Sequence, residues 1–249
     1  METASLILAA GQGKRMKNPD LPKVLTPLDG KPLIHYVLDT VNKMQSKRNV
    51  VVVGHQKEKL VAYLAENFPE VKTCVQSEQL GTGHAVAQAE TLFEDYTGDV
   101  LILAGDVPLI TAETLTNFYN KHIENDSDLS VLTTTVDDAT GYGRIIRDED
   151  GKFYEIIEHK DATDEQRKIK EINSGIYLVK SRLLFLSLKY VSNANEQNEY
   201  YLTDIIGILK SNGAIVNAFD IADFDELQGV NCLEDLRRAE TSLHKMRHE

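Results

Sequence analysis

Between Ser5 and Ile110, short apolar runs rich in β-branched residues alternate with amphipathic stretches. Val50–Val53 and Leu101–Leu103 contain no polar residue, which is typical of strands buried on both faces of a parallel sheet. Between such runs, apolar residues recur at steps of three or four, as in Pro32–Met44. This alternation predicts an α/β fold with a doubly wound, mostly parallel sheet, whose ligands bind beyond the carboxyl ends of the strands.

The individual elements follow from the same pattern. The expected strands are Ser5–Ala10, Asn49–Gly54, Val71–Val75, Val100–Ala104, Leu129–Thr135, Arg144–Arg147, Phe153–Ile157, Ile172–Val179 and Ala214–Phe219. The expected helices are Pro32–Met44, Lys59–Phe68, Gly83–Phe93, Thr111–Ile123 with Thr111 as N-cap, Leu202–Ser211 before Asn212-Gly213, and the charged tail Leu233–His248.

From Leu129 onward, strands and turns replace the βα units. Asp148-Glu-Asp-Gly151 has the composition of a hairpin turn between Gly143–Arg147 and Phe153–Ile157. We expect this part to form an antiparallel extension over the open end of the sheet. Repeats and low-complexity linkers are absent from the sequence, which favours a single domain over residues 1–249.

Charge and cysteine content exclude several classes of protein. The formal net charge of -12 argues against a nucleic-acid partner. No window approaches the roughly 20 apolar residues of a membrane-spanning helix, and the apolar run Leu6–Ala10 is too short for a signal peptide. Cys74 and Cys232 have neither metal-site nor CxxC spacing, so we expect a reducing, cytoplasmic location.

A glycine-rich loop follows the first expected strand directly. Gly11-Gln-Gly13-Lys-Arg15 allows backbone N–H groups to approach an oxyanion, with basic side chains beside it. The loop lacks the Walker A pattern, and Met16 stands where the dinucleotide fingerprint requires glycine. A tight turn with solvated basic residues is the alternative, which Pro22-Lys23 and Gly30-Lys-Pro-Leu33 make less attractive.

Other motifs extend this pattern, and together they carry a family resemblance. Leu8–Met16 and Leu21–Pro32 match LAAGxGxRM and LPKxLxxLxGKP, which resemble the sugar nucleotidyltransferases. The segments that follow in order are Gln76–Ala85, Gly105–Leu109, Thr140–Ile145, Glu158–Asp164, Glu171–Ile176, Glu199–Asp204 and Gly229–Asn231. They resemble the uridylyltransferase half of the bacterial bifunctional N-acetylglucosamine 1-phosphate uridylyltransferase/glucosamine 1-phosphate acetyltransferase, over nearly the whole chain.

The resemblance implies a Rossmann-like, mixed and mostly parallel sheet flanked by helices. Residues 1–128 would form a nucleotide-binding lobe, residues 129–230 a sugar-binding lobe with the antiparallel extension, and residues 231–249 a C-terminal helix. It implies transfer of UMP from UTP to N-acetylglucosamine 1-phosphate, which gives pyrophosphate and UDP-N-acetylglucosamine, a cell-wall precursor. The implied cofactor is Mg²⁺.

Site residues are likewise implied by the resemblance. Arg15 and Lys23 would be catalytic, and Asp106 and Asn231 would bind the metal. The nucleotide-binding residues would be Leu8, Ala9, Ala10, Gly11, Gly13, Gln76, Gln79, Gly81 and Thr82. The sugar-binding residues would be Gly105, Gly143, Glu158, Asn173, Tyr200 and Thr203.

The residues themselves support these roles to different degrees. Amide side chains such as Gln76 and Gln79 offer the donor and acceptor that a uracil edge requires, although without the resemblance a surface position would be the better explanation. Asp106 follows an apolar strand, where it could bind Mg²⁺ or merely cap the next segment. Glu158 suits sugar hydroxyls, but by composition its segment could be a charged surface turn.

The expected chemistry needs no protein nucleophile. A phosphate monoester has a second pKa of about 6, so it is already an anion near neutral pH. No Ser-His-Asp or Cys-His arrangement is apparent among the motifs. Catalysis would therefore rest on bringing two polyanions together and neutralising the charge that develops between them.

Two departures from the family pattern bear on substrate and assembly. Ala104 stands where the family commonly has tyrosine, so sugar or ribose contacts can differ. The β-helical acetyltransferase half is absent from these 249 residues, so we expect neither acetyl transfer nor the trimer that this half forms, and a monomer is expected instead.

Three alternatives remain open at the level of sequence. The first is a nucleotidyltransferase acting on another sugar 1-phosphate or on methylerythritol phosphate. The second is a glycosyltransferase, but Asp106-Val-Pro108 lacks the strand-end DxD usual in that class. The third is a non-catalytic nucleotide-sugar sensor, which would not need Lys23, Asp106 and Asn231 together.

Overall fold

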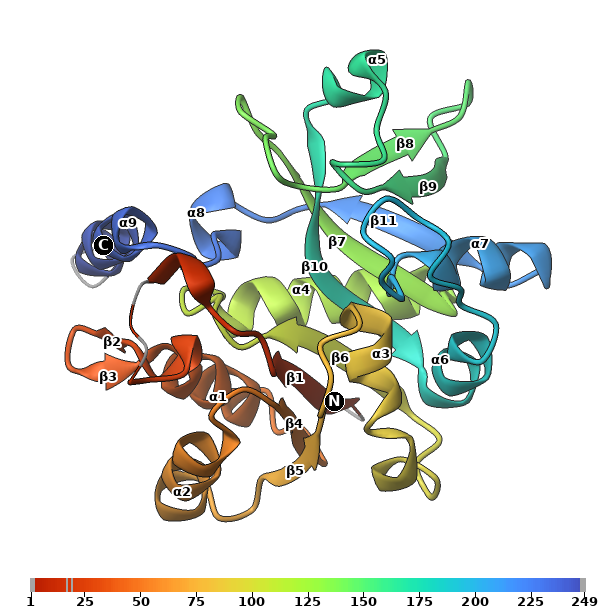
Figure 1. Ribbon diagram of the computed structural model, residues 1–249. Helices are drawn as coiled ribbons and strands as arrows, with labels where there is room; N and C mark the ends of the chain where they lie inside the picture. The colour runs from red at the N-terminus through yellow and green to blue at the C-terminus, as the bar shows by residue number, and fades with distance from the viewer. Residues whose placement is uncertain (1–2, 17, 19, 247–249) are drawn as a thin grey trace.

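The central feature of the computed structural model, which describes residues 3–16, 18 and 20–246, is a mixed sheet with helices on both faces (Figure 1). Its strands in spatial order are β11 (Val216–Asp220), β7 (Leu129–Thr135), β10 (Glu171–Lys180), β6 (Asp99–Ala104), β1 (Thr3–Ala9), β4 (Asn49–Val53) and β5 (Lys72–Val75). Only β10 runs antiparallel to its neighbours on this path, β6 and β7. The expected mixed, mostly parallel sheet is thereby confirmed.

Alternation of side chains along the strands divides the interior into two cores. In β1, Leu6 packs into one core and Ile7 into the other, and both are fully buried. In β6, Ile102 and Leu103 divide in the same way. A strand that is covered on both faces needs apolar residues on both, which explains why β4 and β6 contain unbroken apolar runs.

Each core is closed by its own set of helices. On one face lie α1 (Leu33–Lys43), α2 (Lys57–Asn67) and α4 (Ala112–Glu124). On the other face lie α3 (Thr82–Ala87), α6 (Ser181–Leu188) and α7 (Asp204–Ser211). The C-terminal α9 (Leu233–Met246) packs in a third cluster, beside the short strands β2 (Pro27–Leu28) and β3 (Lys31–Pro32).

The antiparallel extension projects from the sheet at the top of Figure 1. It consists of β8 (Arg144–Arg147) and β9 (Phe153–Ile157), with the short helix α5 (Asp164–Arg167) beside it. Gly151 closes the predicted hairpin turn at φ +75°, and its N–H donates to Asp148 O over 2.9 Å. Arg144 of the hairpin is paired with Ile172 of β10, and the Arg147 side chain bonds to Glu171 of β10 and to Ala218 O of β11.

All nine expected strands are present with ends within two residues of the expected ones, but one expected helix is wrong in extent. Instead of running from Gly83 to Phe93, α3 ends at Ala87, and a separate 3-10 turn, η3 (Glu90–Leu92), follows. The cause lies at Gln88. Its N–H bonds to Ala85 O, three residues back, and its side-chain amide covers His84 O, so the α-helical ladder stops there.

Other elements were outside the expectations or differ at their ends. The elements that the sequence pattern did not predict are β2, β3, α5, α6, α8 (Phe224–Leu227) and the 3-10 turns η1 (Lys14–Met16) and η2 (Lys23–Leu25). Thr111 caps α4 as expected, because its hydroxyl accepts from Thr114 N over 3.1 Å. The final residues of the expected tail, His248 included, lie outside the described residues.

Two sequence-level exclusions can be compared with the structure. Within the described residues, no helix combines the length and apolar composition that a bilayer-crossing segment needs. Cys74 and Cys232 are both free thiols. Burial raises the pKa of the Cys74 thiol to about 11, so it stays protonated at neutral pH.

Candidate active site

The glycine loop passes directly over the lysine that follows it in sequence. Gly13 has φ +60°, and a Cβ at this position would lie 2.7 Å from the Cβ of Lys23. Only glycine allows both the backbone conformation and the close approach without strain. The loop then continues into η1, where Met16 is buried and Arg15 is exposed.

Lys23 is held at the centre of the site by its neighbours in η2. Val24 and Leu25 are buried, which fixes the short turn to the core. The Lys23 ammonium forms an ion pair with Asp106 Oδ2 and lies 3.0 Å from Asn231 Oδ1. Its side chain is only 16% exposed and that of Asp106 only 14%, so this pair is largely shielded from solvent.

The two candidate metal ligands are brought together by the backbone. Asp106 follows β6, and Val230 N donates to Asp106 O over 2.8 Å, which places the loop 229–231 beside the end of that strand. The carboxylate of Asp235 accepts from Asn231 N (2.9 Å) and Cys232 N (3.0 Å) at the beginning of α9. Asp106 and Asn231, which are distant in sequence, are therefore held side by side, and we call this pair the metal corner.

The donor set at this corner fits Mg²⁺. A carboxylate oxygen of Asp106 and the amide oxygen of Asn231 converge on a single cation, the Lys23 ammonium. Both are hard oxygen ligands of the kind that Mg²⁺ prefers. Within the described chain, no group of three or more His, Cys, Asp or Glu side chains is placed to bind a metal. The remaining ligands would therefore come from phosphate oxygens and water, as is usual for Mg²⁺.

A hollow of about 290 Å³ lies on one side of Lys23 and Asp106. It is lined by eight of the nine expected nucleotide-binding residues, namely Leu8, Ala9, Ala10, Gly11, Gln76, Gln79, Gly81 and Thr82. The ninth, Gly13, lines an adjoining hollow of about 410 Å³ together with Lys14, Arg15 and Lys23. The apolar, amide-lined hollow and the basic one thus lie side by side.

Gln76 is not a surface residue, contrary to the alternative interpretation of its sequence. It is 4% exposed, and its backbone N–H continues the sheet by donating to Val53 O over 2.8 Å. The side-chain Nε2 donates to Gly81 O over 3.1 Å and lies 3.1 Å from His84 Nδ1. These contacts fix the orientation of the amide at the edge of the hollow.

Tyr200 lies against the base side of the site. Gly81 has φ +112°, and a Cβ there would lie 2.5 Å from Tyr200 O. Tyr200 N donates to Leu80 O, and Gly83 N donates to Tyr200 O, both over 2.8 Å. The backbone of Tyr200 therefore supports the Gly81-Thr82 turn, and the sugar contact that the resemblance implies for this residue stays a prediction.

Four other expected sugar contacts gather at the base of the β8–β9 extension. An added Cβ on Gly143 would lie 3.6 Å from Glu158 Oε1 and 3.5 Å from Asn173 Cβ. The Thr203 hydroxyl donates to Glu158 Oε1 over 3.5 Å. Burial, and then the charge of Asp161, raise the pKa of the Glu158 carboxyl above its usual range. Gly105 lies apart from these four, with its N–H donating to Leu8 O over 2.9 Å.

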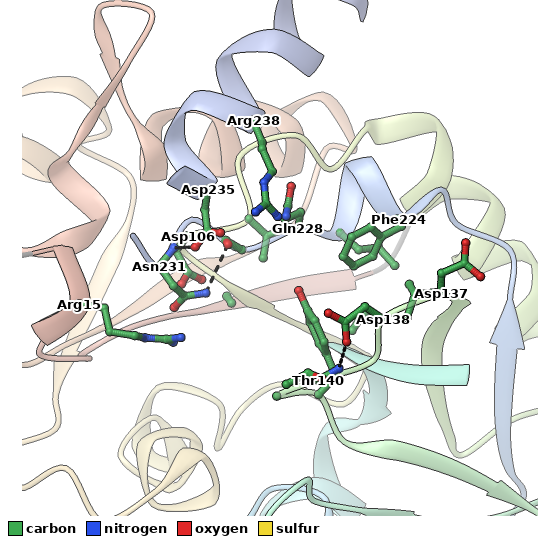
Figure 2. A pocket seen from close by; sticks show the side chains of 18 of the residues that line it. Arg15, Asp106, Asp137, Asp138, Thr140, Phe224, Gln228, Asn231, Asp235 and Arg238 are labelled. Atoms are coloured by element: carbon green, nitrogen blue, oxygen red, sulfur yellow. Dashed lines mark hydrogen bonds between the residues drawn. The ribbon is translucent and has the colours of Figure 1, made fainter. Parts of the chain in front are cut away.

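A larger hollow of about 730 Å³ opens on the opposite side of Asp106 and Asn231. Figure 2 shows Arg15 reaching into it from one wall and Arg238 from the first turns of α9. Ala104 lines both this hollow and the base-side hollow, so the two adjoin at the residue where the family commonly has tyrosine. Gly143, Glu158, Asn173 and Thr203 do not line it.

Several residues at the site were not singled out from the sequence. Glu199 lines both the amide-lined and the basic hollow. From its motif, Glu199–Asp204, only Tyr200 and Thr203 were expected at the site. Tyr142 lines the large hollow, where burial and then the charges of Asp235 and Asp106 raise its pKa. Asp235 was detectable in principle, because an acidic residue four positions after Asn231 in a first helical turn suits backbone capping.

Comparison with known sequences gives a family match and curated relatives. A model described as nucleotidyl transferase matches residues 4–224. The chain is 46% identical over all 249 residues to the bifunctional protein GlmU of Exiguobacterium sibiricum, and it covers 55% of that protein. It is 44% identical over 245 residues to the bifunctional protein GlmU of Enterococcus faecalis, covering 53% of it. The chain therefore spans about half the length of the curated relatives it matches.

Solved structures agree on the fold. The crystal structure of UDP-glucose pyrophosphorylase complexed with UDP-glucose superposes with a TM-score of 0.75. The match covers 99% of this chain and 100% of that one at 20% sequence identity. Such a likeness shows the α/β fold, and it leaves the substrate to be argued from the site.

Proposed function

The chain belongs to the nucleotidyl transferase family, and from this premise we propose that it transfers UMP from UTP to N-acetylglucosamine 1-phosphate. The products are UDP-N-acetylglucosamine and pyrophosphate. The observation that carries this proposal is the convergence on Lys23 of three features: the glycine loop, the amide-lined hollow, and the oxygens of Asp106 and Asn231.

In the proposed step, an oxygen of the sugar phosphate attacks the α-phosphorus of UTP in line. The new P–O bond forms as the bond to the β-phosphate oxygen breaks, and pyrophosphate leaves with the electron pair. The attacking phosphate is largely dianionic above its second pKa of about 6, so no base has to remove a proton. The protein has to bring two anions together and offset their repulsion.

Lys23 and Arg15 are suited to that task. Lys23 lines both the amide-lined and the basic hollow and forms an ion pair with Asp106, so its ammonium would contact the α-phosphate being transferred. Arg15 lines the basic hollow and also reaches the large one, so its guanidinium would contact the leaving pyrophosphate. Asp106 and Asn231 would hold Mg²⁺, which when bound neutralises phosphate charge.

Recognition of the base is proposed for the amide-lined hollow. The Gln76 Nε2 faces Gly81 O and His84 Nδ1, which leaves the side-chain Oε1 to accept a hydrogen bond from the N3–H of uracil. The acceptor sugar is proposed to meet Glu158, Asn173 and Gly143 at the base of the extension. The carboxylate suits sugar hydroxyls, and the amide suits an N-acetyl group.

A pyrophosphate-release panel tests this proposal directly. Four nucleoside triphosphates are combined with N-acetylglucosamine, glucose and galactose 1-phosphates, with and without Mg²⁺. We expect release with UTP and N-acetylglucosamine 1-phosphate, dependent on Mg²⁺. Release only with CTP, or only with glucose 1-phosphate, would overturn the substrate assignment. Release with no pair would favour a nucleotide-sugar sensor.

The proposal extends to location and assembly. Two free cysteines fit a reducing compartment, which supports a cytoplasmic location. We propose a monomer for these 249 residues, and light scattering during size-exclusion chromatography tests this. Acetyl transfer is not part of the proposal.

A further inference from the structure

Strand β10 carries an irregularity directly beside the proposed acceptor site. Asn173 is paired with Thr133 of β7, whereas Tyr177 is paired with Val131. Between these two pairs, β10 therefore contains two more residues than β7. Gly175 lies within this bulge at φ +79°. The Ser174 hydroxyl donates to Leu132 O over 2.6 Å and so fixes the bulge to the neighbouring strand. A bulge of this kind changes the direction in which the neighbouring side chains point.

The bulge places the Asn173 side chain between two fixed partners. Its Nδ2 donates to the Tyr177 hydroxyl oxygen over 2.7 Å, and its Oδ1 accepts from Gly175 N over 2.9 Å. A primary amide has two N–H donors and two acceptor lone pairs. One donor and one lone pair are therefore used internally, and one of each is left for a ligand. The two contacts also distinguish the nitrogen end from the oxygen end.

Tyr177 is a polar group in an otherwise apolar setting. It is 3% exposed and belongs to the core that contains Ile102, Val131 and Val179. Burial, and then the negative charge of Glu158, raise the pKa of the phenol far above neutrality. The hydroxyl is thus neutral at working pH, and it contacts Asn173, one of the groups proposed to meet the acceptor sugar.

We propose that Tyr177 is a positioning residue that holds the Asn173 amide in one orientation and thereby selects an N-acetylamino group over a hydroxyl on the acceptor sugar. The inference rests on the proposed function, in which Asn173 meets that sugar. An N-acetyl group presents a donor and an acceptor at fixed places, so it requires a protein amide whose two ends do not exchange. A hydroxyl group rotates to suit either orientation and gains little from this constraint.

Tyr177→Phe removes the hydroxyl and keeps the ring in the core. We expect the KM for N-acetylglucosamine 1-phosphate to rise by about two- to tenfold, which is the value of one net hydrogen bond. The KM for UTP should stay within twofold of the wild-type value, as a role confined to the acceptor side requires. The preference for N-acetylglucosamine 1-phosphate over glucose 1-phosphate, as a ratio of kcat/KM values, should fall by a similar factor.

Two controls separate positioning from loss of stability. Tyr96→Phe removes a half-buried phenol contact elsewhere, where the Tyr96 hydroxyl donates to Asp99 O over 3.2 Å, and should change neither KM nor preference. Tyr177→Phe added to Asn173→Ala should bring no further loss of preference, because Tyr177 acts through Asn173. The comparison of the double variant with Asn173→Ala remains informative even if Tyr177→Phe alone is less stable than the wild type.

The outcomes distinguish this inference from the proposed function. If the wild type does not use N-acetylglucosamine 1-phosphate, the proposed function fails. If the wild type uses it and Tyr177→Phe keeps the full preference between the two sugar phosphates, only the positioning role is wrong. Equal rises in the KM for UTP and for the acceptor would also overturn that role, because they indicate a general disturbance of the fold.

Discussion

The Lys23 ammonium lies between the two oxygens that are expected to bind Mg²⁺. A positive charge in this position offsets the charge of Asp106 and competes with an entering cation for the same ligands. For Lys23→Ala, we expect Mn²⁺, as a spectroscopic substitute, to bind the nucleotide-free protein at least about threefold more tightly. Turnover should fall by about 10²–10³, because the transferred phosphate loses its cation.

Electron paramagnetic resonance of free Mn²⁺ measures the first effect, and pyrophosphate release measures the second. Lys31→Ala is a matched control, since Lys31 is 54% exposed and pairs only loosely with Asp39 at 3.8 Å. Near-normal turnover in Lys23→Ala would remove Lys23 from the catalytic site. Unchanged Mn²⁺ affinity would show that its ammonium does not compete for Asp106 and Asn231.

Glu158 provides a prediction about pH. Its carboxyl has a raised pKa in the folded protein, chiefly through burial, so the unfolded chain loses this proton at a lower pH than the folded one. The stability that Glu158 contributes is then fully present below its ordinary pKa of 4.5 and is lost as pH rises through the folded value. Glu158→Gln should therefore be more stable than the wild type at pH 7.

The expected advantage of Glu158→Gln shrinks toward pH 4.5 and below. Thermal unfolding between pH 4 and pH 8 measures it, and the KM for the acceptor should rise in the same variant because a carboxylate contact is lost. A stability difference that stays constant across this range would show that the titration of Glu158 is not coupled to folding.

At the level of elements, the strands were predictable and several helices were not. Buried parallel strands have a distinctive composition, so β4 and β6 were clear in sequence. The helix α6 reads SRLLFLSL, in which four consecutive apolar residues, 183–186, obscure the helical period. The early end of α3 depends on hydrogen bonds of Gln88, which propensity does not reveal.

The Gly81 turn is an element whose backbone can be tested. Gly81→Ala combines a left-handed φ of +112° with a Cβ only 2.5 Å from Tyr200 O. We expect a loss of about 2–4 kcal/mol in the free energy of unfolding, together with a higher KM for UTP because the turn borders the amide-lined hollow. Chemical denaturation and initial-rate kinetics measure the two effects.

Gly151→Ala is the matched control for backbone strain. Gly151 also has a positive φ, +75°, but nothing lies within 4 Å of an added Cβ. Its cost should be about 1 kcal/mol, with no change in the KM for UTP. If both variants lose the same stability and keep the same KM, close contact with Tyr200 does not shape the site.

At the level of the whole molecule, the family could be identified from the sequence because its motifs occur in order, and the family match confirms it. The meeting of Lys23 with Asn231, 208 positions apart, could not be obtained from spacing, since it depends on how loop 229–231 follows Asp106. The insertion of β10 between β6 and β7 was equally hidden, because an antiparallel strand in a mostly parallel sheet has no separate sequence signal.

The C-terminal helix couples the outer surface of the molecule to the metal corner. Ala239 of α9 is 3% exposed and packs in the cluster with Leu28 and Leu33, while Asp235, four residues earlier in the same helix, accepts from the Asn231 backbone. Packing of the helix and placement of a candidate metal ligand thus depend on each other. A substitution on the packed face of α9 should therefore alter the placement of Asn231.

Ala239→Asp would bury a charge in that cluster and displace α9. We expect a loss of about 2–4 kcal/mol in the free energy of unfolding and weaker binding of Mn²⁺ with UTP, as Asn231 loses its support. Thr241→Asp adds the same charge to an exposed position of the helix and should leave both quantities nearly unchanged. If Ala239→Asp is destabilised yet binds Mn²⁺ and UTP like the wild type, α9 stabilises the fold without shaping the site, and Asp106 with Lys23 must define the metal corner by themselves.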